Sequence, residues 1–172
     1  MARKRANLFR VEFEQNRLAL IGQLTETSTF PKLDFSQLSS VEVSLEKFEG
    51  INSAGVQTWT RWISGLPATT NFVFSKSRPF INYYFGSVDK MLPARCDLLS
   101  FYVPYFNPES NEIELLEFTR GVHFTESELR VPRKVSSVHQ PYPNLELDAT
   151  PSRYFYFLKA FFPKIVLGML GS

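Results

Sequence analysis

Residues 41–56 read VEVSLEKFEGINSAGV. In the first half of this stretch, valine and leucine alternate with glutamate and serine, which is the period of a strand that buries one face. The second half turns at Gly50, passes the polar residues Asn52 and Ser53, and continues with apolar residues at helical spacing. The stretch therefore predicts a core strand that leads directly into an amphipathic helix.

The helix is expected over residues 57–66, and Ser53 can serve as its N-cap by accepting hydrogen bonds from first-turn amides. Gly65 and Pro67 end it. Its apolar positions are spaced by three and four, so they line one face of the helix. They are Val56, Trp59, Ile63 and Leu66.

The flanking sequence predicts further strands and a second helix. Alternation of apolar and polar residues on both sides of a Gln-Asn pair predicts a β-hairpin near the start of the chain. The second helix is expected over residues 80–91, with Ser77 as N-cap and Pro79 in its first turn. The other strands are expected at residues 8–13, 18–24, 72–74, 98–105 and 113–118, with a turn at 107–111.

This order of elements predicts an α/β fold in which a mixed β-sheet is covered by helices. We assign residues 1–105 to this unit and residues 106–172 to a C-terminal extension packed on it. The extension is expected to contain a β-hairpin, an irregular part and a final helix. Because prolines interrupt residues 130–150, that part is expected to be mostly extended.

The final helix is expected over residues 153–162, and Pro163 ends or kinks it. Its aromatic stripe is too apolar to lie in water, and two interpretations stay open. Either the stripe packs on its own domain, or it is exposed and binds a partner or a membrane surface. No apolar run reaches the roughly 20 residues that a membrane span needs. The stripe consists of Tyr154, Phe155, Phe157, Leu158, Phe161 and Phe162.

Composition argues against several functions. The formal net charge is +2 and the one dense basic group is residues 3–5, so nucleic acid is not an expected partner. Cys96 is the single cysteine, and His123 and His139 are far apart, so no disulfide, metal site or cofactor is expected. The first residues lack the apolar core of a signal peptide, which favours a cytoplasmic location.

Enzyme signatures are absent from the sequence. It contains no glycine-rich phosphate loop, no paired-histidine metal motif and no Gly-x-Ser-x-Gly elbow. The junction at residues 50–56 is more informative, because a helix N-terminus concentrates unpaired amides and positive partial charge. A serine there has neighbours suited to hold an anion, including a phosphoryl group on its own hydroxyl. We therefore expect a binding module and not an enzyme.

The junction resembles the STAS family, whose members place an acidic residue, a serine or threonine, a small residue and a glycine at this strand-to-helix turn. The resemblance covers roughly residues 8–105. In the anti-sigma-factor antagonists of that family a cognate kinase phosphorylates the serine and blocks binding, which implies this role for Ser53. Asn52 stands where those regulators usually carry aspartate, so an acidic group is missing from the kinase-facing surface. The matching residues are Ile51, Asn52, Ser53, Ala54, Gly55 and Val56.

The sequence is also similar to a group of stand-alone bacterial STAS-like proteins with an Ile-Asn-Ser-x-Gly-Val motif and a following Trp. In that group, cysteine pairs resembling a zinc ribbon follow the domain. Residues 107–110 and 138–141 fall where such pairs would lie, and neither contains cysteine. The resemblance therefore implies a ribbon without metal, held by strands at residues 101–105 and 113–118.

We expect a regulatory module that binds a protein partner, such as an anti-sigma-factor-like kinase or another signalling protein, and that phosphorylation of Ser53 disrupts. A plain capping role for Ser53 is the structural alternative. A second hypothesis is an adaptor subunit or a homo-oligomer that binds through the C-terminal aromatic helix. A third is a small anionic ligand, such as a nucleotide, at the helix N-terminus. The expected partner-binding residues are Asn52, Ser53, Ala54, Gly55, Gln57 and Trp62.

Overall fold

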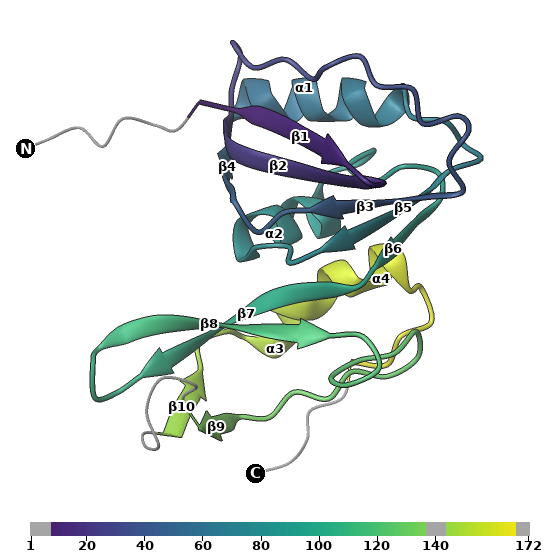
Figure 1. Cartoon of the computed structure of the whole chain (residues 1–172). Coiled ribbons are helices and arrows are strands. Elements are labelled where there is room, and N and C mark those ends of the chain that lie inside the picture. Colours follow the sequence, from purple (N-terminus) through teal and green to yellow (C-terminus); the bar gives the residue numbers. More distant parts are fainter. Residues whose placement is uncertain (1–7, 137–143, 168–172) are drawn as a thin grey trace, which may run out of the picture.

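A computed structural model describes residues 8–136 and 144–167 (Figure 1). Residues 3–5, His139 and the predicted ribbon position 138–141 lie outside the described residues. The described chain has an α/β fold with two β-sheets, which confirms the predicted fold class. Its strands and helices are β1 (Arg10–Glu14), β2 (Arg17–Leu24), β3 (Ser40–Ser44), β4 (Phe48–Ile51), α1 (Ser53–Ser64), β5 (Asn71–Ser75), α2 (Pro79–Ser87), β6 (Cys96–Leu98), β7 (Ser100–Asn107), β8 (Glu112–Thr119), β9 (Lys134–Ser136), β10 (Asn144–Leu147), α3 (Pro151–Tyr154), the 3₁₀ helix η1 (Phe155–Phe157) and α4 (Leu158–Phe161).

The first sheet has the strand order β1-β2-β3-β5-β6, and β4 also pairs with β2. β1 and β2 form the predicted antiparallel hairpin, with Gln15 and Asn16 at positive φ in its two-residue turn. The other neighbouring strands run parallel to one another. The sheet is therefore mixed, as expected, and its antiparallel strand lies at one edge.

β4 is a strand that the sequence did not predict. β3 pairs with the first residues of β2 and β4 pairs with its last residues, and the register along β2 shifts between Gly22 and Gln23. Gly50 lies inside β4, beside the side chain of Gln23, so the turn predicted at Gly50 is wrong. Pairing with β2 satisfies backbone groups that a turn would have left to solvent.

α1 packs its apolar face against the first sheet (Figure 1). Trp59 and Ile63 are buried, as the helical spacing predicted. The indole N–H of Trp59 donates a hydrogen bond of 2.8 Å to the Met91 carbonyl, so the largest side chain in the core has no unmet polar group. This contact fixes the segment after α2 against α1.

α2 differs from its prediction at both ends. It ends at Ser87 and not at Met91, because the chain becomes extended there. Its N-cap position is Arg78, which makes no side-chain cap, so the prediction that Ser77 caps this helix is wrong. The Ser77 hydroxyl donates instead to the side-chain oxygen of buried Asn82 at 2.6 Å. The Ser77 hydroxyl therefore bonds to a buried polar side chain and does not cap the helix.

The second sheet is antiparallel and has the order β8-β7-β10-β9. The chain leaves the first sheet after β6 and enters the second at Ser100, so the single strand predicted over residues 98–105 is two strands in two sheets. Residues 100–105, which we assigned to the first unit, belong to the second sheet. β7 and β8 form the hairpin, and β9 and β10 are short strands within the part expected to be extended.

The final helix predicted over residues 153–162 is divided into α3, η1 and α4. A 3₁₀ segment has about three residues per turn, so Phe155 and Leu158 point the same way, and both are buried. η1 lies close to α2, because a Cβ added to Gly86 would be 3.0 Å from the Cα of Phe157. Buried side chains from both sheets and from these helices form one continuous core.

Candidate functional site

Asn52 holds the N-terminus of α1. Its side-chain oxygen accepts a hydrogen bond of 2.7 Å from the Gly55 amide, so Asn52 is the N-cap. The prediction that Ser53 caps the helix is wrong, because Ser53 is the first helical residue. The Asn52 side-chain nitrogen donates to the Glu26 carboxylate at 2.8 Å, and the Asn52 amide donates to the Leu24 carbonyl at 3.2 Å. These bonds attach the helix to the end of β2 and to the loop that follows it.

Gly55 allows α1 to approach β2 closely. A Cβ at this position would lie 2.2 Å from the Leu24 carbonyl oxygen and 3.1 Å from the Ile51 side chain. No side chain fits there without a shift of the backbone. The glycine of the motif is therefore required by packing at the helix entrance.

Ser53 is exposed on the first turn of α1. Asn52 beside it and Gln57 further along the helix are also exposed, whereas Ala54 is partly buried and Gly55 is buried. Among the first-turn amides, those of Ser53 and Ala54 have no hydrogen-bond acceptor within the described residues. Of the predicted partner-binding residues, Asn52, Ser53 and Gln57 thus share one accessible surface.

Glu26 belongs to this surface, and the sequence analysis missed it. The carboxylate is exposed, and its hydrogen bond from Asn52 lowers the pKa of Glu26 below the usual glutamate value. It is therefore ionised at neutral pH and lies at the positive end of α1. We expected Asn52 to leave this surface without an acidic group, but Asn52 binds one from 26 positions away in the sequence. No local pattern reveals such a pair, because it depends on how the loop folds back onto the helix.

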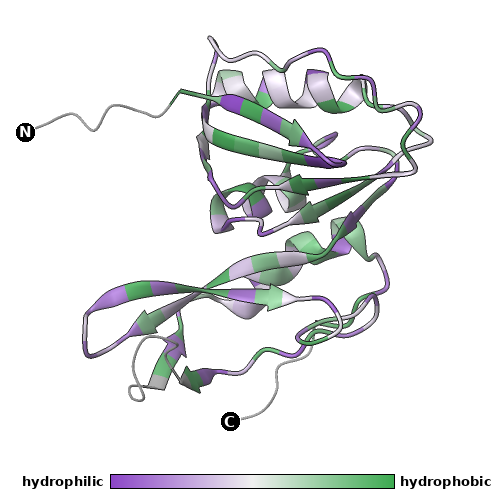
Figure 2. Cartoon of the chain, viewed as in Figure 1, coloured by the Kyte–Doolittle hydropathy of each residue, from purple (hydrophilic) through white to green (hydrophobic). Residues whose placement is uncertain are grey.

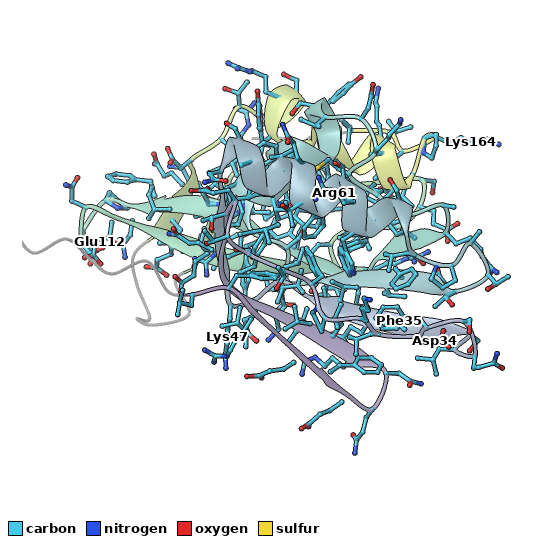
Figure 3. All side chains as sticks on the ribbon, turned by 90° about the horizontal axis from the view of Figure 1, so that it is seen from above. Asp34, Phe35, Lys47, Arg61, Glu112 and Lys164 are labelled. Carbon is cyan, nitrogen blue, oxygen red and sulfur yellow. The ribbon has the colours of Figure 1, made fainter. Side chains whose placement is uncertain are left out.

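A groove of about 850 Å³ lies between α1 and the loop after β2. Glu26 lines it, and Arg61 and Trp62 contribute to its helical wall. The Phe30 and Trp62 rings are stacked, with centroids 4.2 Å apart and planes 1° apart. The loop therefore half-buries Trp62, which we had expected to be a partner-binding residue. Arg61, one of the residues that line the groove, is labelled on α1 in Figure 3.

The C-terminal aromatic stripe packs on its own domain. Four of its side chains are buried in the core, and Tyr154 and Phe161 are partly buried. Phe161 packs edge-on against Phe74 of β5 and Phe85 of α2. The large apolar side chain that this segment exposes is Tyr156, which the stripe did not include. The four buried residues are Phe155, Phe157, Leu158 and Phe162.

Tyr154 fixes the C-terminal segment through its hydroxyl. That hydroxyl donates to the Tyr102 carbonyl and accepts a hydrogen bond of 3.4 Å from the Asn82 side chain. Burial raises the pKa of Tyr154 well above its ordinary value, so the group stays protonated. The bonds join α3 to β7 and α2, which is a structural role.

Two residues with reactive side chains also have structural roles. His123 stacks on Phe118 with centroids 4.6 Å apart, and its Nδ1 accepts a hydrogen bond from the Thr119 amide. Burial raises the pKa of the Cys96 thiol to about 11, which leaves very little thiolate at neutral pH. Within residues 8–136 and 144–167, no three His, Cys, Asp or Glu side chains gather as a metal site would require.

No family model, no curated protein and no solved structure matches this chain. The resemblance to the STAS family therefore stays a prediction, based on the motif around Ser53 and on the order of elements. Among the described residues, no helix has both the length and the apolar character needed to cross a membrane. What the structure adds is an exposed serine at a helix entrance, directly after the asparagine that binds an ionised glutamate, and this glutamate lines a groove.

Proposed function

We propose that this chain is a cytoplasmic, non-enzymatic regulator that binds a protein partner at the start of α1, in the manner of STAS-type anti-sigma-factor antagonists. The binding surface would consist of Asn52, Ser53, Gln57 and the groove beside Trp62. Phosphorylation of Ser53 would disrupt the complex. The observation that supports this proposal is the exposed Ser53 hydroxyl, which directly follows the residue that binds Glu26 and is not needed as the helix cap.

A phosphoryl group on Ser53 would change this surface mainly through charge. It adds about 1.5 to 2 negative charges at neutral pH. The amides of Ser53 and Ala54 have no other acceptor within the described residues, so they could bind the phosphate at the positive end of the helix. Together with Glu26, which Asn52 binds, the phosphate would make the start of α1 strongly acidic. A partner that places apolar or acidic groups there would be repelled.

Ser53 can be substituted without removing the cap of α1. Asn52 accepts the capping hydrogen bond, so Ser53→Ala leaves that bond in place. A glutamate in the first helical turn interacts favourably with the helix dipole, so Ser53→Glu should not weaken the helix. Loss of binding in the second variant would therefore report on the surface and not on folding.

The test uses wild-type protein, Ser53→Ala and Ser53→Glu as baits in a lysate of the native cell, with and without ATP. Mass spectrometry identifies captured proteins and phosphorylated residues. We expect one set of partners to bind wild type and Ser53→Ala but not Ser53→Glu, with phosphate on Ser53 of the wild type. Ser64→Glu, at the exposed far end of α1, is the matched control and should keep the partners. Equal capture by Ser53→Glu and wild type would contradict the switch.

The same amides allow a competing proposal, a small anionic ligand at the start of α1. The ionised Glu26 carboxylate at this position opposes an anion, so we favour the protein partner. A thermal-shift screen with nucleotides and inorganic phosphate separates the two. A ligand at 100 times its dissociation constant should stabilise the chain by about 2.7 kcal/mol, and such a shift would favour the ligand.

A further inference from the structure

Among the residues that the structure describes, β8 is an edge strand of the second sheet. It pairs with β7 on one side, and no described residue pairs with it on the other. Its register with β7 runs without a bulge over the whole strand, from Glu112 to Thr119. β6 and β9, which are also edge strands, have only three residues each. Figure 1 shows the β7 and β8 hairpin extending to one side of the molecule.

The hydrogen bonds of β7 show which backbone groups of β8 point outward. In an antiparallel pair, residues alternate between those that bond across the pair and those that point away from it. Pro104 has no N–H, and its carbonyl accepts a hydrogen bond of 3.0 Å from Asp148 on the far side of β7. Its partner across the pair, Leu115, therefore directs its N–H and C=O to the open edge. The same alternation places the groups of Ile113 and Glu117 there.

Two further hydrogen bonds agree with this assignment. The Tyr102 amide donates to Ser77 at 2.8 Å, away from β8, and the Thr119 amide donates to the His123 ring at 3.1 Å, away from β7. Both residues have the same parity as Pro104 and Leu115 in the pairing. The open edge thus offers a regular row of donors and acceptors to an added strand.

Apolar side chains accompany these outward groups. Pro104, Phe106, Ile113 and Leu115 share the face of the hairpin that is turned away from the core. They are only partly covered, and Ile113 is 48% exposed. Figure 2 shows hydrophobic and hydrophilic residues alternating along the hairpin. A strand added beside β8 would cover this face with its own alternate side chains.

The charge of the β7 and β8 hairpin indicates which kind of added strand would bind to it. Residues 100–119 contain four glutamates and no Asp, Lys, Arg or His, so their charge is −4. The whole chain carries +2, so the rest of it carries +2 − (−4) = +6. A second copy paired edge to edge would bring two acidic strands together, which is unfavourable. Glu112 projects at one end of the molecule in Figure 3, where a basic side chain can reach it.

We propose that the edge of β8 is a second docking site, which binds an extended segment of a partner protein as an added strand. The segment alternates apolar residues with Lys or Arg. Its backbone bonds to the outward groups of residues 113, 115 and 117, and its apolar side chains cover Ile113 and Leu115. Its basic side chains project from the opposite face, near Glu112. This site is separate from the surface at Ser53 and does not depend on the function proposed for it.

The test uses two short blocked peptides, KVTVKVTV and EVTVEVTV, with the full-length chain at low salt. Fluorescence anisotropy measures binding, and amide hydrogen exchange by NMR locates it. We expect the basic peptide to bind, with slower exchange at the amides of Ile113, Leu115 and Glu117. The amides of Glu114 and Leu116 should change little, because they already bond to β7. Binding of neither peptide, or equal binding of both, would overturn the proposal.

Substitutions test the backbone groups of the β8 edge separately from its charged side chains. Ile113→Pro removes one outward N–H and no hydrogen bond to β7, so the chain should stay folded. The basic peptide should then no longer slow amide exchange along the edge of β8. Glu112→Lys should weaken binding of the basic peptide about tenfold. Glu14→Lys, on the edge strand β1 of the other sheet, is the matched charge control and should bind like wild type. Concentration-dependent protection of the same amides without peptide would instead identify a second copy and overturn the proposal.

Discussion

The Asn52 side-chain nitrogen lies 2.8 Å from the Glu26 carboxylate, and this bond attaches the loop after β2 to the start of α1. The oxygen of the same amide accepts the capping hydrogen bond from Gly55. One side chain therefore closes the helix end and fixes an acidic group beside Ser53. The geometry separates two residues that sequence analysis treated as one motif, because Asn52 supports the helix while Ser53 remains accessible.

Removing the cap should destabilise the chain, and removing the neighbouring hydroxyl should not. We expect Asn52→Ala to lower the free energy of unfolding by about 1 kcal/mol, because a first-turn amide loses its acceptor. Ser53→Ala should change it by less than about 0.5 kcal/mol. Urea unfolding followed by circular dichroism measures both variants. The reverse order of effects would show that Ser53 is the cap.

A methyl group at Gly55 should be costly even though alanine favours helices. Alanine gains about 1 kcal/mol of helix propensity over glycine. At Gly55, however, its Cβ would meet the backbone carbonyl of Leu24 at 2.2 Å, so we expect a net loss of at least about 2 kcal/mol. Gly65→Ala is the control, since its nearest neighbour would be 3.5 Å away. Equal unfolding midpoints for the two variants would contradict the close approach of α1 to β2.

Alanine substitutions at two neighbouring positions of the C-terminal segment should differ sharply in their effect on stability. Phe157 is 2% exposed, and Phe157→Ala should cost about 3 to 5 kcal/mol through the cavity it leaves. Tyr156 is 54% exposed, and Tyr156→Ala should cost less than about 0.5 kcal/mol. Thermal unfolding at one protein concentration compares the two variants. Similar losses of stability would mean that the segment does not pack as described.

The partly buried thiol of Cys96 should resist alkylation in the folded chain. Folding raises its pKa from 9.0 to about 11, so at pH 8 the thiolate fraction falls about a hundredfold. Iodoacetamide labelling followed by mass spectrometry should therefore be at least that much slower in buffer than in urea. Because folding favours the protonated form, the associated stability is present below pH 9 and is lost as pH rises towards 11. Equal rates in buffer and urea would contradict the raised pKa of this partly buried thiol.

The periodic parts of the sequence predicted their elements well. The alternation at residues 41–45, the hairpin of β1 and β2, and the buried face of α1 all appear in the structure. Each depends on contacts between a repeating apolar face and a core, which the spacing of residues specifies directly. The α/β class followed from the order of these elements.

The wrong predictions occurred where a contact between residues far apart in the sequence determined the local structure. Ser77 was predicted to cap a helix, but its hydroxyl donates a hydrogen bond to the buried Asn82 side chain instead. The strand predicted over residues 98–105 divides because the chain passes from one sheet to another there. The C-terminal helix is interrupted by a 3₁₀ turn that directs Phe155, Phe157 and Leu158 into the shared core. Local propensity cannot anticipate these outcomes, because partners far along the chain compete for the same groups.

The candidate site shows the same division between local pattern and tertiary contact. The sequence by itself determined that a polar pair precedes an amphipathic helix and that a glycine follows one turn later. Tertiary structure alone decided that Asn52 is the cap, that Glu26 adjoins it, and that the loop covers Trp62. Helix spacing is a property of neighbouring residues, whereas these contacts form only when a loop with no period of its own folds back across α1.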